Sequence, residues 1–388
     1  MVHNRYGKGG GEDTVAEGIC RLLTEHGHEV VQFSRNSADI IGMRYGNVRA
    51  FFSGIYSPSV AREFKACLAQ EKPDIVHIQN VYPLISPSVF AISRQASIPV
   101  VFRCANYRMF CPNGLLYSRG EICERCVGGR EYWCVLRNCM KPMPKSIGYA
   151  VRNAYARVSG LITKNTTMYY MPSEFQKQKF VAWGIPSDRI AVIPNFITAP
   201  ERPGGTGKLG EYVAYAGGIS PYKGFPSLLL AAQKCHDIPF RVAGCLRPPP
   251  KVGYDIPSNM MFLGRLARDD MATFYANARM VIMPSTCYET FGMVIVEAMI
   301  EGRPVVASRI SGIPGIVDED STGLLYEPGN SDELAGKIRR LWNDAHLCRT
   351  MGQAGREKAL REYSPERYYQ RLMAVYQKAM RQELTCRQ

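Results

Sequence analysis

Two glutamates eight residues apart, Glu289 and Glu297, flank a Phe-Gly pair after an apolar run that ends at Met283. This pattern predicts a strand, a tight turn and a helix that begins at about Gly292. The first turn of such a helix presents free backbone N–H groups and the positive end of the helix dipole, which favour a diphosphate. Glycine at 292 lets the backbone approach that ligand closely. Glu297, about one turn into the helix, is placed to accept hydrogen bonds from ribose hydroxyls, and Glu289 lies within reach of a sugar.

A second candidate site is a group of six cysteines between residues 104 and 139. At its centre, Cys123-Glu-Arg-Cys126 is flanked by Cys111 and Cys139, each about a dozen residues away. Thiolates at this spacing can converge on a tetrahedral zinc ion without a large hydrophobic core. The sequence leaves two interpretations open, a structural zinc held by these four residues or a set of free thiols. A disulfide is less favoured in a reducing compartment.

The elements that must position these residues alternate between apolar strands and helical patterns in both halves of the chain. This alternation is typical of parallel βαβ units and predicts an α/β fold. A Pro- and Gly-rich segment at 198–207 predicts a hinge between two domains. The predicted strands are 74–78, 99–102 and 168–171 in the first half, and 212–215, 240–243, 260–263, 280–283 and 304–307 in the second.

The amino terminus does not fit this scheme. The turn around Gly9, Gly10 and Gly11 should follow a first strand, yet Met1 and Val2 are the only apolar residues before the polar residues 3–5. We therefore predict that the first strand is missing and that its neighbours have unpaired edges. The same segment has no apolar core of the kind that secretion signals contain.

Composition narrows the classes of function. The chain has 46% hydrophobic and 21% charged residues, as ordinary globular proteins do, and no apolar run long enough to span a membrane. The net charge is +14 and is concentrated in residues 1–190. A basic half suits an anionic membrane surface, a phosphate-bearing substrate or simple solvation. No nucleic-acid-binding motif is present, so we expect no nucleic-acid partner. Thirteen cysteines, an odd number, favour the cytoplasm.

The ordered series of motifs resembles glycosyltransferase family 4 over nearly the whole chain. The glutamate pair is its most specific part, and a match in one motif alone would be weak. The remaining motifs, in chain order, are Tyr6-Gly-Lys-Gly-Gly-Gly-Glu-Asp13, Gly27-His-Glu-Val30, Pro73-Asp-Ile-Val-His77, Ile193-Pro-Asn195, Ser220-Pro-Tyr-Lys223-Gly224, Glu301-Gly-Arg-Pro-Val-Val-Ala307 and Thr322-Gly-Leu-Leu325.

The resemblance implies the GT-B architecture, in which two Rossmann-like domains face one another across a cleft and a C-terminal helix crosses back to the first domain. The acceptor-side domain would comprise residues 1–197, with a Cys-rich insertion at about 104–140 and a returning helix at 366–388. Residues 198–365 would form the sugar-nucleotide-binding domain. The implied reaction is transfer of a hexose from a nucleotide-diphosphate sugar with retention of configuration, and no metal at the chemical step.

Roles carry over to residues at the matching positions. Lys223 would bind the donor diphosphate, and Glu289 with the amides of Gly292 and Met293 would hold the sugar and phosphate. Glu297 would bind the ribose. Phe291 and Val294 complete the donor-side segment, and Gly10 and Gly11 would line the acceptor side. The implied acceptor is a glycan or a lipid-linked glycan, which would place the protein in the cytoplasm or at the inner face of the cell membrane.

Two positions depart from the family pattern. Family members usually have a Gly-Arg pair near the phosphate lysine, where this chain has Gly217-Gly218, and an active-site histidine where this chain has Ala105. An arginine fork on a diphosphate contributes roughly 1.5–3 kcal/mol. The departures therefore leave a second hypothesis beside the active transferase: a catalytically impaired, sugar-nucleotide-binding subunit of a glycan-assembly complex.

Overall fold

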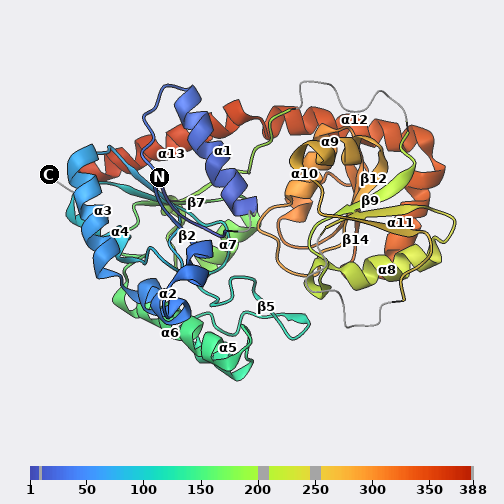
Figure 1. The fold of residues 1–388 in the computed structure, drawn as a ribbon. Helices are drawn as coiled ribbons and strands as arrows, with labels where there is room; N and C mark the ends of the chain where they lie inside the picture. Colours follow the sequence, from blue (N-terminus) through green and yellow to red (C-terminus); the bar gives the residue numbers. More distant parts are fainter. Residues whose placement is uncertain (8–10, 200–208, 245–254, 386–388) are drawn as a thin grey trace. The chain divides into compact units, whose positions relative to one another are not determined.

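The structure is a computed structural model that describes residues 1–7, 11–199, 209–244 and 255–385. The chain forms two compact units, which are drawn in Figure 1. One unit contains residues 1–119, 123–193 and 369–388, and the other contains 120–122 and 194–368. Most of the predicted hinge, from residue 200 onward, lies outside the described residues.

The first unit is built on a six-stranded parallel sheet in the order β2-β1-β3-β4-β7-β8. Its interior strands are buried on both faces, as parallel sheets covered by helices are. The three predicted strands of this half are confirmed within two residues. The strands are β1 (Val2–Arg5), β2 (Phe33–Asn36), β3 (Val76–Asn80), β4 (Val100–Arg103), β7 (Met168–Met171) and β8 (Ile190–Val192).

The prediction of a missing first strand is wrong. Strand β1 is an interior strand, because Val2 is paired with Phe33 of β2 on one side and with Ile78 of β3 on the other. Its polar side chains escaped the apolar pattern because they have specific buried partners. His3 Nε2 lies 2.7 Å from Asp13 Oδ1, and Asn4 Oδ1 accepts a hydrogen bond from the backbone N–H of Leu84 at 3.0 Å.

Helices of the first unit cover this sheet with an apolar core. Phe64 and Leu68 of α3 and Phe90 of α4 pack against the strands in one buried cluster. The helices are α1 (Gly11–Glu25), α2 (Gly46–Ile55), α3 (Pro58–Glu71), α4 (Ser88–Gln95), α5 (Tyr132–Leu136), α6 (Met143–Ser159) and α7 (Glu174–Ala182). A short hairpin of β5 (Tyr117–Ser118) and β6 (Glu121–Ile122) belongs to the Cys-rich segment.

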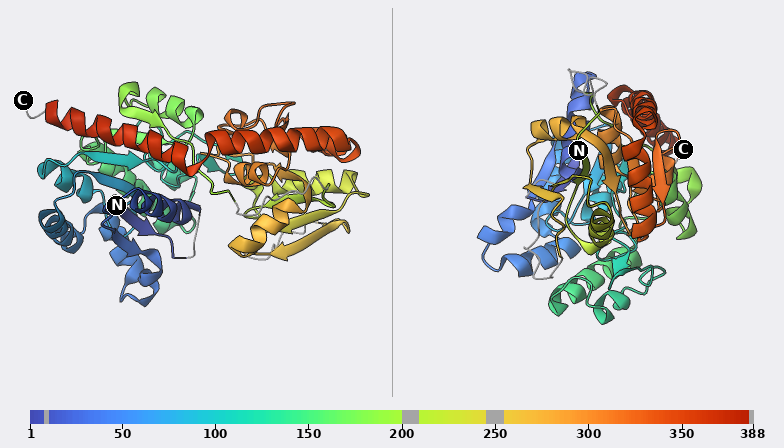
Figure 2. Two further views of the ribbon diagram at one scale, coloured as in Figure 1. Left: turned by 90° about the horizontal axis from the view of Figure 1, so that it is seen from above. Right: turned by 90° about the vertical axis from the view of Figure 1, so that its right-hand side faces the viewer.

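The last helix, α13 (Pro365–Thr385), returns to the first unit, as Figure 2 shows. The Tyr369 ring stacks on His26 with 3.7 Å between ring centroids, and Tyr376 Oη lies 2.5 Å from His77 Nδ1 of β3. Toward the end of the helix, Glu383 forms an ion pair with Arg94 of α4. The prediction that the C-terminal helix crosses back to the first domain is confirmed.

The second unit repeats this plan with a parallel sheet in the order β11-β10-β9-β12-β13-β14. One apolar layer joins it to α9, α10 and α12, and another joins it to α8 and α11. All five strands predicted for this half are present. The elements are β9 (Tyr212–Ala216), α8 (Phe225–Lys234), β10 (Phe240–Ala243), β11 (Met260–Gly264), α9 (Arg268–Ala276), β12 (Ala278–Met283), α10 (Met293–Ile300), β13 (Val305–Ser308), β14 (Gly323–Tyr326), α11 (Ser331–Asn343) and α12 (Ala345–Glu362).

Among the described helices, none combines the length and the apolar character that a membrane span requires.

Candidate active site

The donor-side site of the second unit lies where β12 ends and α10 begins. Gly292 is the N-cap residue of α10, which begins at Met293, as predicted. A Cβ at position 292 would come within 2.8 Å of the Ile295 side chain and 3.2 Å of the Met283 sulfur, so a larger residue here would displace these side chains. The first amides of α10 are therefore fixed beside the loop 284–291, in the arrangement that binds anions at helix N-termini.

Lys223 reaches this loop from a separate turn. It ends the short 3-10 helix Pro221–Lys223, and Gly224 follows in the left-handed region with φ of 72°. A Cβ on Gly224 would lie 1.6 Å from the carbonyl oxygen of Pro284, so the turn sits directly against the end of β12. The Thr286 N–H also donates a hydrogen bond to the Tyr222 carbonyl at 3.0 Å. These backbone contacts bring Lys223 to the glutamate loop.

Glu289 is the centre of the polar contacts in this loop. Its Oε1 atom accepts hydrogen bonds from Lys223 Nζ and from Ser285 Oγ, each at 2.6 Å. Its backbone N–H donates to Ser311 Oγ at 2.9 Å. Ser311 has a left-handed backbone with φ of 52°, a conformation that costs a non-glycine residue energy and that clusters at functional sites. Two hydrogen bonds therefore hold the carboxylate, and a third holds the backbone of Glu289.

The ion pair is half-buried, and this sets the charge of the lysine. Burial lowers the pKa of Lys223, but the charge and hydrogen bond of the Glu289 carboxylate, together with other neighbouring groups, raise the pKa above its ordinary value. The lysine is thus a cation at neutral pH. Its side chain remains 31% exposed.

Glu297 lies within α10, as predicted, and has a tyrosine partner that the sequence did not reveal. Tyr275 Oη, at the end of α9, donates a hydrogen bond to Glu297 Oε2 at 2.7 Å. Burial and the neighbouring Glu297 carboxylate hold the pKa of Tyr275 well above its usual value, so the hydroxyl stays protonated and remains a donor. The contact orients the carboxylate that the ribose assignment requires.

The other donor-side candidates differ in burial. The Phe291 side chain is buried against Tyr363, so its backbone groups remain as candidates for ligand contact. Met293 and Val294 pack against the same apolar core but are only partly buried. Sequence reasoning missed Ser285, Ser311 and Tyr275. The two serines follow adjacent strands, β12 and β13, so the rule that ligands bind at the carboxyl ends of parallel strands could have identified them, whereas no sequence signal marks Tyr275.

Gly218, where the family usually has arginine, has room for a larger residue. A Cβ at this position would meet no atom within 4 Å. The Gly218 carbonyl accepts a hydrogen bond from Tyr215 Oη at 2.8 Å, which fixes the backbone next to β9. A side chain here would enter open space.

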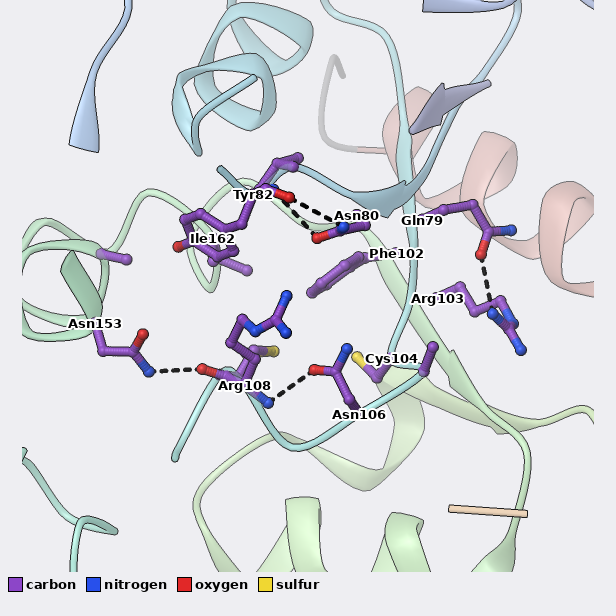
Figure 3. A pocket seen from close by; sticks show the side chains of 14 residues that line it. Gln79, Asn80, Tyr82, Phe102, Arg103, Cys104, Asn106, Arg108, Asn153 and Ile162 are labelled. Atoms are coloured by element: carbon purple, nitrogen blue, oxygen red, sulfur yellow. Dashed lines mark hydrogen bonds between the residues drawn. The ribbon is translucent and has the colours of Figure 1, made fainter. Parts of the chain in front are cut away.

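The first unit has a cavity of about 40 Å³ at the carboxyl ends of β3 and β4, which Figure 3 shows from close by. Ala105, the position of the usual family histidine, is part of its lining. The loop after β4 is held in place by two amide side chains. Asn153 Nδ2 donates to the Arg108 carbonyl at 2.6 Å, and Gln176 Nε2 donates to the Cys104 carbonyl at 2.9 Å.

Arg108 supplies a positive charge to this cavity and is tied to α1. One of its guanidinium N–H groups donates to Tyr6 Oη at 3.2 Å, and Tyr6 donates to Glu12 Oε2 at 3.0 Å. Arg108 Nε is buried without a hydrogen-bond partner among the described residues. Figure 3 shows the Arg108 side chain extending between Tyr82 and Asn106 into the cavity.

The two glycines predicted for the acceptor side have different outcomes. Gly10 lies outside the described residues. Gly11 is the first residue of α1, and a Cβ there would meet no atom within 4 Å.

Two imidazoles of the first unit, His3 and His77, do not replace the histidine that the family usually has at position 105. His3 is engaged by Asp13, and burial keeps the pKa of His77 well below its ordinary value, so this imidazole is neutral.

The four cysteines predicted to bind zinc line one small cavity of the first unit, and the structure adds Cys134 to them. All five are free thiols. Within the described parts of the chain, no three His, Cys, Asp or Glu side chains stand ready to hold a metal ion.

Comparison with known protein families explains why both units carry these features. Residues 10–195 match the sequence model of the glycosyl transferase 4-like domain, and residues 205–358 match that of glycosyl transferases group 1. The chain belongs to glycosyltransferase family 4. The glutamate loop and Lys223 lie in the group 1 match, and the cavity at Arg108 lies in the 4-like match.

Related sequences and structures agree with this assignment. This chain is 41% identical over 101 residues to a sulfoquinovosyl transferase of Arabidopsis thaliana, a match that covers 25% of this chain and 20% of that protein. It is 31% identical over 207 residues to lipopolysaccharide 1,2-N-acetylglucosaminetransferase of Salmonella typhimurium, covering 46% and 54%. The matches thus span a fifth to about half of these relatives' lengths.

The fold is shared with a solved structure, HepE of Anabaena in complex with UDP-glucose. The TM-score is 0.66 at 19% identity, and the superposition covers 96% of this chain and 98% of HepE. The likeness shows the GT-B fold and confirms the predicted fold class.

Proposed function

We propose that this family 4 member transfers a hexose from a nucleotide-diphosphate sugar to a glycan or lipid-linked glycan acceptor, with retention of configuration. The bond between the anomeric carbon and the diphosphate oxygen breaks, and a bond from an acceptor hydroxyl oxygen to the same carbon forms. The hydroxyl proton is released, and the nucleoside diphosphate leaves. The anomeric configuration of the donor is kept in the product.

The ion pair between Lys223 and Glu289, beside the N-terminus of α10, is the observation that supports this proposal most directly. A diphosphate leaving group develops negative charge as its bond to the sugar breaks. Lys223 and the first amides of α10 supply positive charge where that diphosphate would lie. We assign Glu289 to the sugar and Glu297 to the ribose hydroxyls. Because Lys223 and the helix provide this stabilisation, the proposed chemistry requires no metal ion.

Ligands of a similar protein support the donor class. HepE has been solved in complex with UDP, with UDP and glucose, and with UDP-glucose. The Salmonella relative is named for the transfer of N-acetylglucosamine to lipopolysaccharide. A nucleotide-diphosphate sugar and a lipid-borne glycan are therefore the first donor and acceptor classes to test.

Exposed apolar and basic side chains on the first unit favour an acceptor that is presented at an anionic membrane. Helices α2 and α6 pack together, since Phe51 lies against Gly148. They and the preceding turn expose large apolar side chains, namely Ile41, Tyr45, Val48, Phe52, Ile147, Val151, Tyr155 and Val158. Exposed basic residues lie among them or close by, namely Arg44, Arg49, Lys141 and Lys145. Apolar and basic side chains together are suited to the interface of an anionic bilayer.

Two measurements test the proposed function. The chain would be incubated with a panel of uridine- and guanosine-diphosphate sugars and a lipid-linked acceptor, and product formation and anomeric configuration would be followed by NMR. We expect one donor to be used, with retention and without any added divalent cation. An inverted product, or a rate that requires added Mg²⁺ or Mn²⁺, would contradict the mechanism. Sedimentation with anionic vesicles tests whether the chain binds a membrane surface. Phe52→Glu should reduce the binding, whereas Val181→Glu, at an exposed position in α7, should leave it unchanged.

A second candidate function is favoured by Ala105 and Gly218. A chain that lacks two groups that usually assist catalysis could bind a sugar nucleotide as a partner subunit of a glycan-assembly complex. Calorimetry with nucleoside diphosphates separates the two candidates when combined with the turnover assay. Tight binding without turnover on any donor would favour the partner subunit, and binding with turnover the transferase.

A further inference from the structure

The Cys-rich segment is long and has little regular structure of its own. Between β4 and α6 the chain runs from residue 104 to 142, and its only regular elements are two strands of two residues and the five-residue helix α5. Its apolar core is small. Cys126 and Cys134 are buried with Ala150, and Trp133 and Met140 pack against them. Segments with little regular structure and a small local core are often stabilised by a bound metal or by disulfides.

Five cysteines of this segment, Cys111, Cys123, Cys126, Cys134 and Cys139, line a single cavity together with Asn113 and Ser118. No three of them are arranged to hold a metal ion in the described structure, so an ion would have to draw their sulfur atoms together. The volume of this cavity is about 10 Å³. A space of this size is about that of one water molecule, so it admits a bare metal ion and excludes an organic ligand.

Polar side chains contact two of the sulfur atoms. Cys111 Sγ donates a hydrogen bond to Asn113 Oδ1 at 2.9 Å, and Ser118 Oγ lies 3.3 Å from Cys139 Sγ. Neighbours of this kind orient the side chains of metal ligands.

We propose that Cys111, Cys123, Cys126 and Cys139 bind one zinc ion that stabilises this segment. A cysteine sulfur moves about a single side-chain torsion, so thiols that already share a cavity can be drawn together by an ion. Four thiolates give the closed tetrahedral coordination of structural zinc, with no open position for chemistry. Cys134 is the fifth thiol. It lies in the short helix α5 and stands outside the Cys123–Cys126 pair and its two flanking cysteines, so we leave it out of the ligand set.

Metal analysis of the full-length chain is the first test, and it does not depend on the proposed function because no substrate is used. Protein purified without added metal or chelator should contain about one zinc per chain. Replacement by Co²⁺ should give the strong visible absorption of a tetrahedral thiolate site. Metal-free protein whose thiols all react with a thiol reagent under native conditions would overturn the proposal, and so would a mass that shows disulfides among these cysteines.

Variants test the assignment of ligands. Cys111→Ser, Cys123→Ser, Cys126→Ser and Cys139→Ser should each lower the zinc content and the melting temperature. Cys134→Ser is the matched control in the same cavity and should keep its zinc, as should Cys67→Ser in α3. Equal loss of zinc from Cys134→Ser and Cys126→Ser would overturn the assignment. If ligand variants fail to fold, the cobalt spectrum of the unmodified chain still decides between a tetrathiolate site and none.

Discussion

Lys223 Nζ lies 2.6 Å from Glu289 Oε1, although 66 residues separate the two in sequence. The contact depends on a left-handed turn at Gly224 that abuts the end of β12. It places a fixed cation beside the first turn of α10. The ion pair therefore prepares the site for an anion, because Lys223 is positioned by a carboxylate before any ligand arrives.

Removing this cation should weaken diphosphate binding. We expect Lys223→Ala to lower the affinity for the correct nucleoside diphosphate roughly 10- to 100-fold, since charge-assisted hydrogen bonds contribute about 1.5–3 kcal/mol. Calorimetry measures the affinity directly. Lys234→Ala is the matched control, because Lys234 forms an exposed ion pair with Asp332 in the same unit. Equal affinities of Lys223→Ala and the unmodified chain would show that the diphosphate binds elsewhere.

The two glutamates should separate binding from turnover. Glu297→Ala should lower nucleotide affinity roughly tenfold or more by removing charged hydrogen bonds to the ribose, with little loss for a nucleotide that lacks the ribose hydroxyls. Glu289→Ala should lower turnover as well as affinity. Tyr275→Phe should have a smaller effect than Glu297→Ala, because it removes only the hydroxyl that orients Glu297. Unchanged binding in Glu297→Ala would exclude the ribose assignment.

Gly224 should be sensitive to the addition of a single methyl group. Gly224→Ala adds a Cβ that would lie 1.6 Å from the Pro284 carbonyl oxygen, at a backbone φ of 72°. We expect a loss of stability above the roughly 1–3 kcal/mol of backbone strain alone. Gly329→Ala isolates that strain, since Gly329 has φ of 85° and no atom within 4 Å of its Cβ position. Similar melting temperatures for the two variants would show that the contact between Gly224 and Pro284 is not tight.

Restoring the two usual family residues should increase turnover. Loss of one group that stabilises a transition state typically costs about 2.7–4 kcal/mol, or roughly a hundred- to a thousandfold in rate. Gly218→Arg enters open space, and Ala105 is a partly exposed residue in the lining of the cavity near Arg108. We expect the double variant to be faster than the unmodified chain on the same donor, with each single variant between them. A fall in turnover would show that other cations already fill these roles.

The sequence by itself determined the parts of the fold that rest on local patterns. Apolar runs bounded by Gly and Pro predicted eight of the twelve described strands of the two parallel sheets, because buried parallel strands must be apolar on both faces. The start of α10 at Gly292 followed from the same local logic, since a helix start after a strand has a recognisable glycine turn. The order of motifs was sufficient for the family and hence for the GT-B fold.

Tertiary structure decided the features that depend on distant partners. Strand β1 was missed because His3 and Asn4 are stabilised there by Asp13 and Leu84, which no local pattern reveals. Tyr275 and Ser311 reach the two glutamates from other elements, and Cys134 joins the other cysteines only because α5 folds over their cavity. A polar side chain is recognised in sequence by its type, but its partner is chosen by the packing of the whole chain, because hydrogen bonds and ion pairs form across space and not along the sequence.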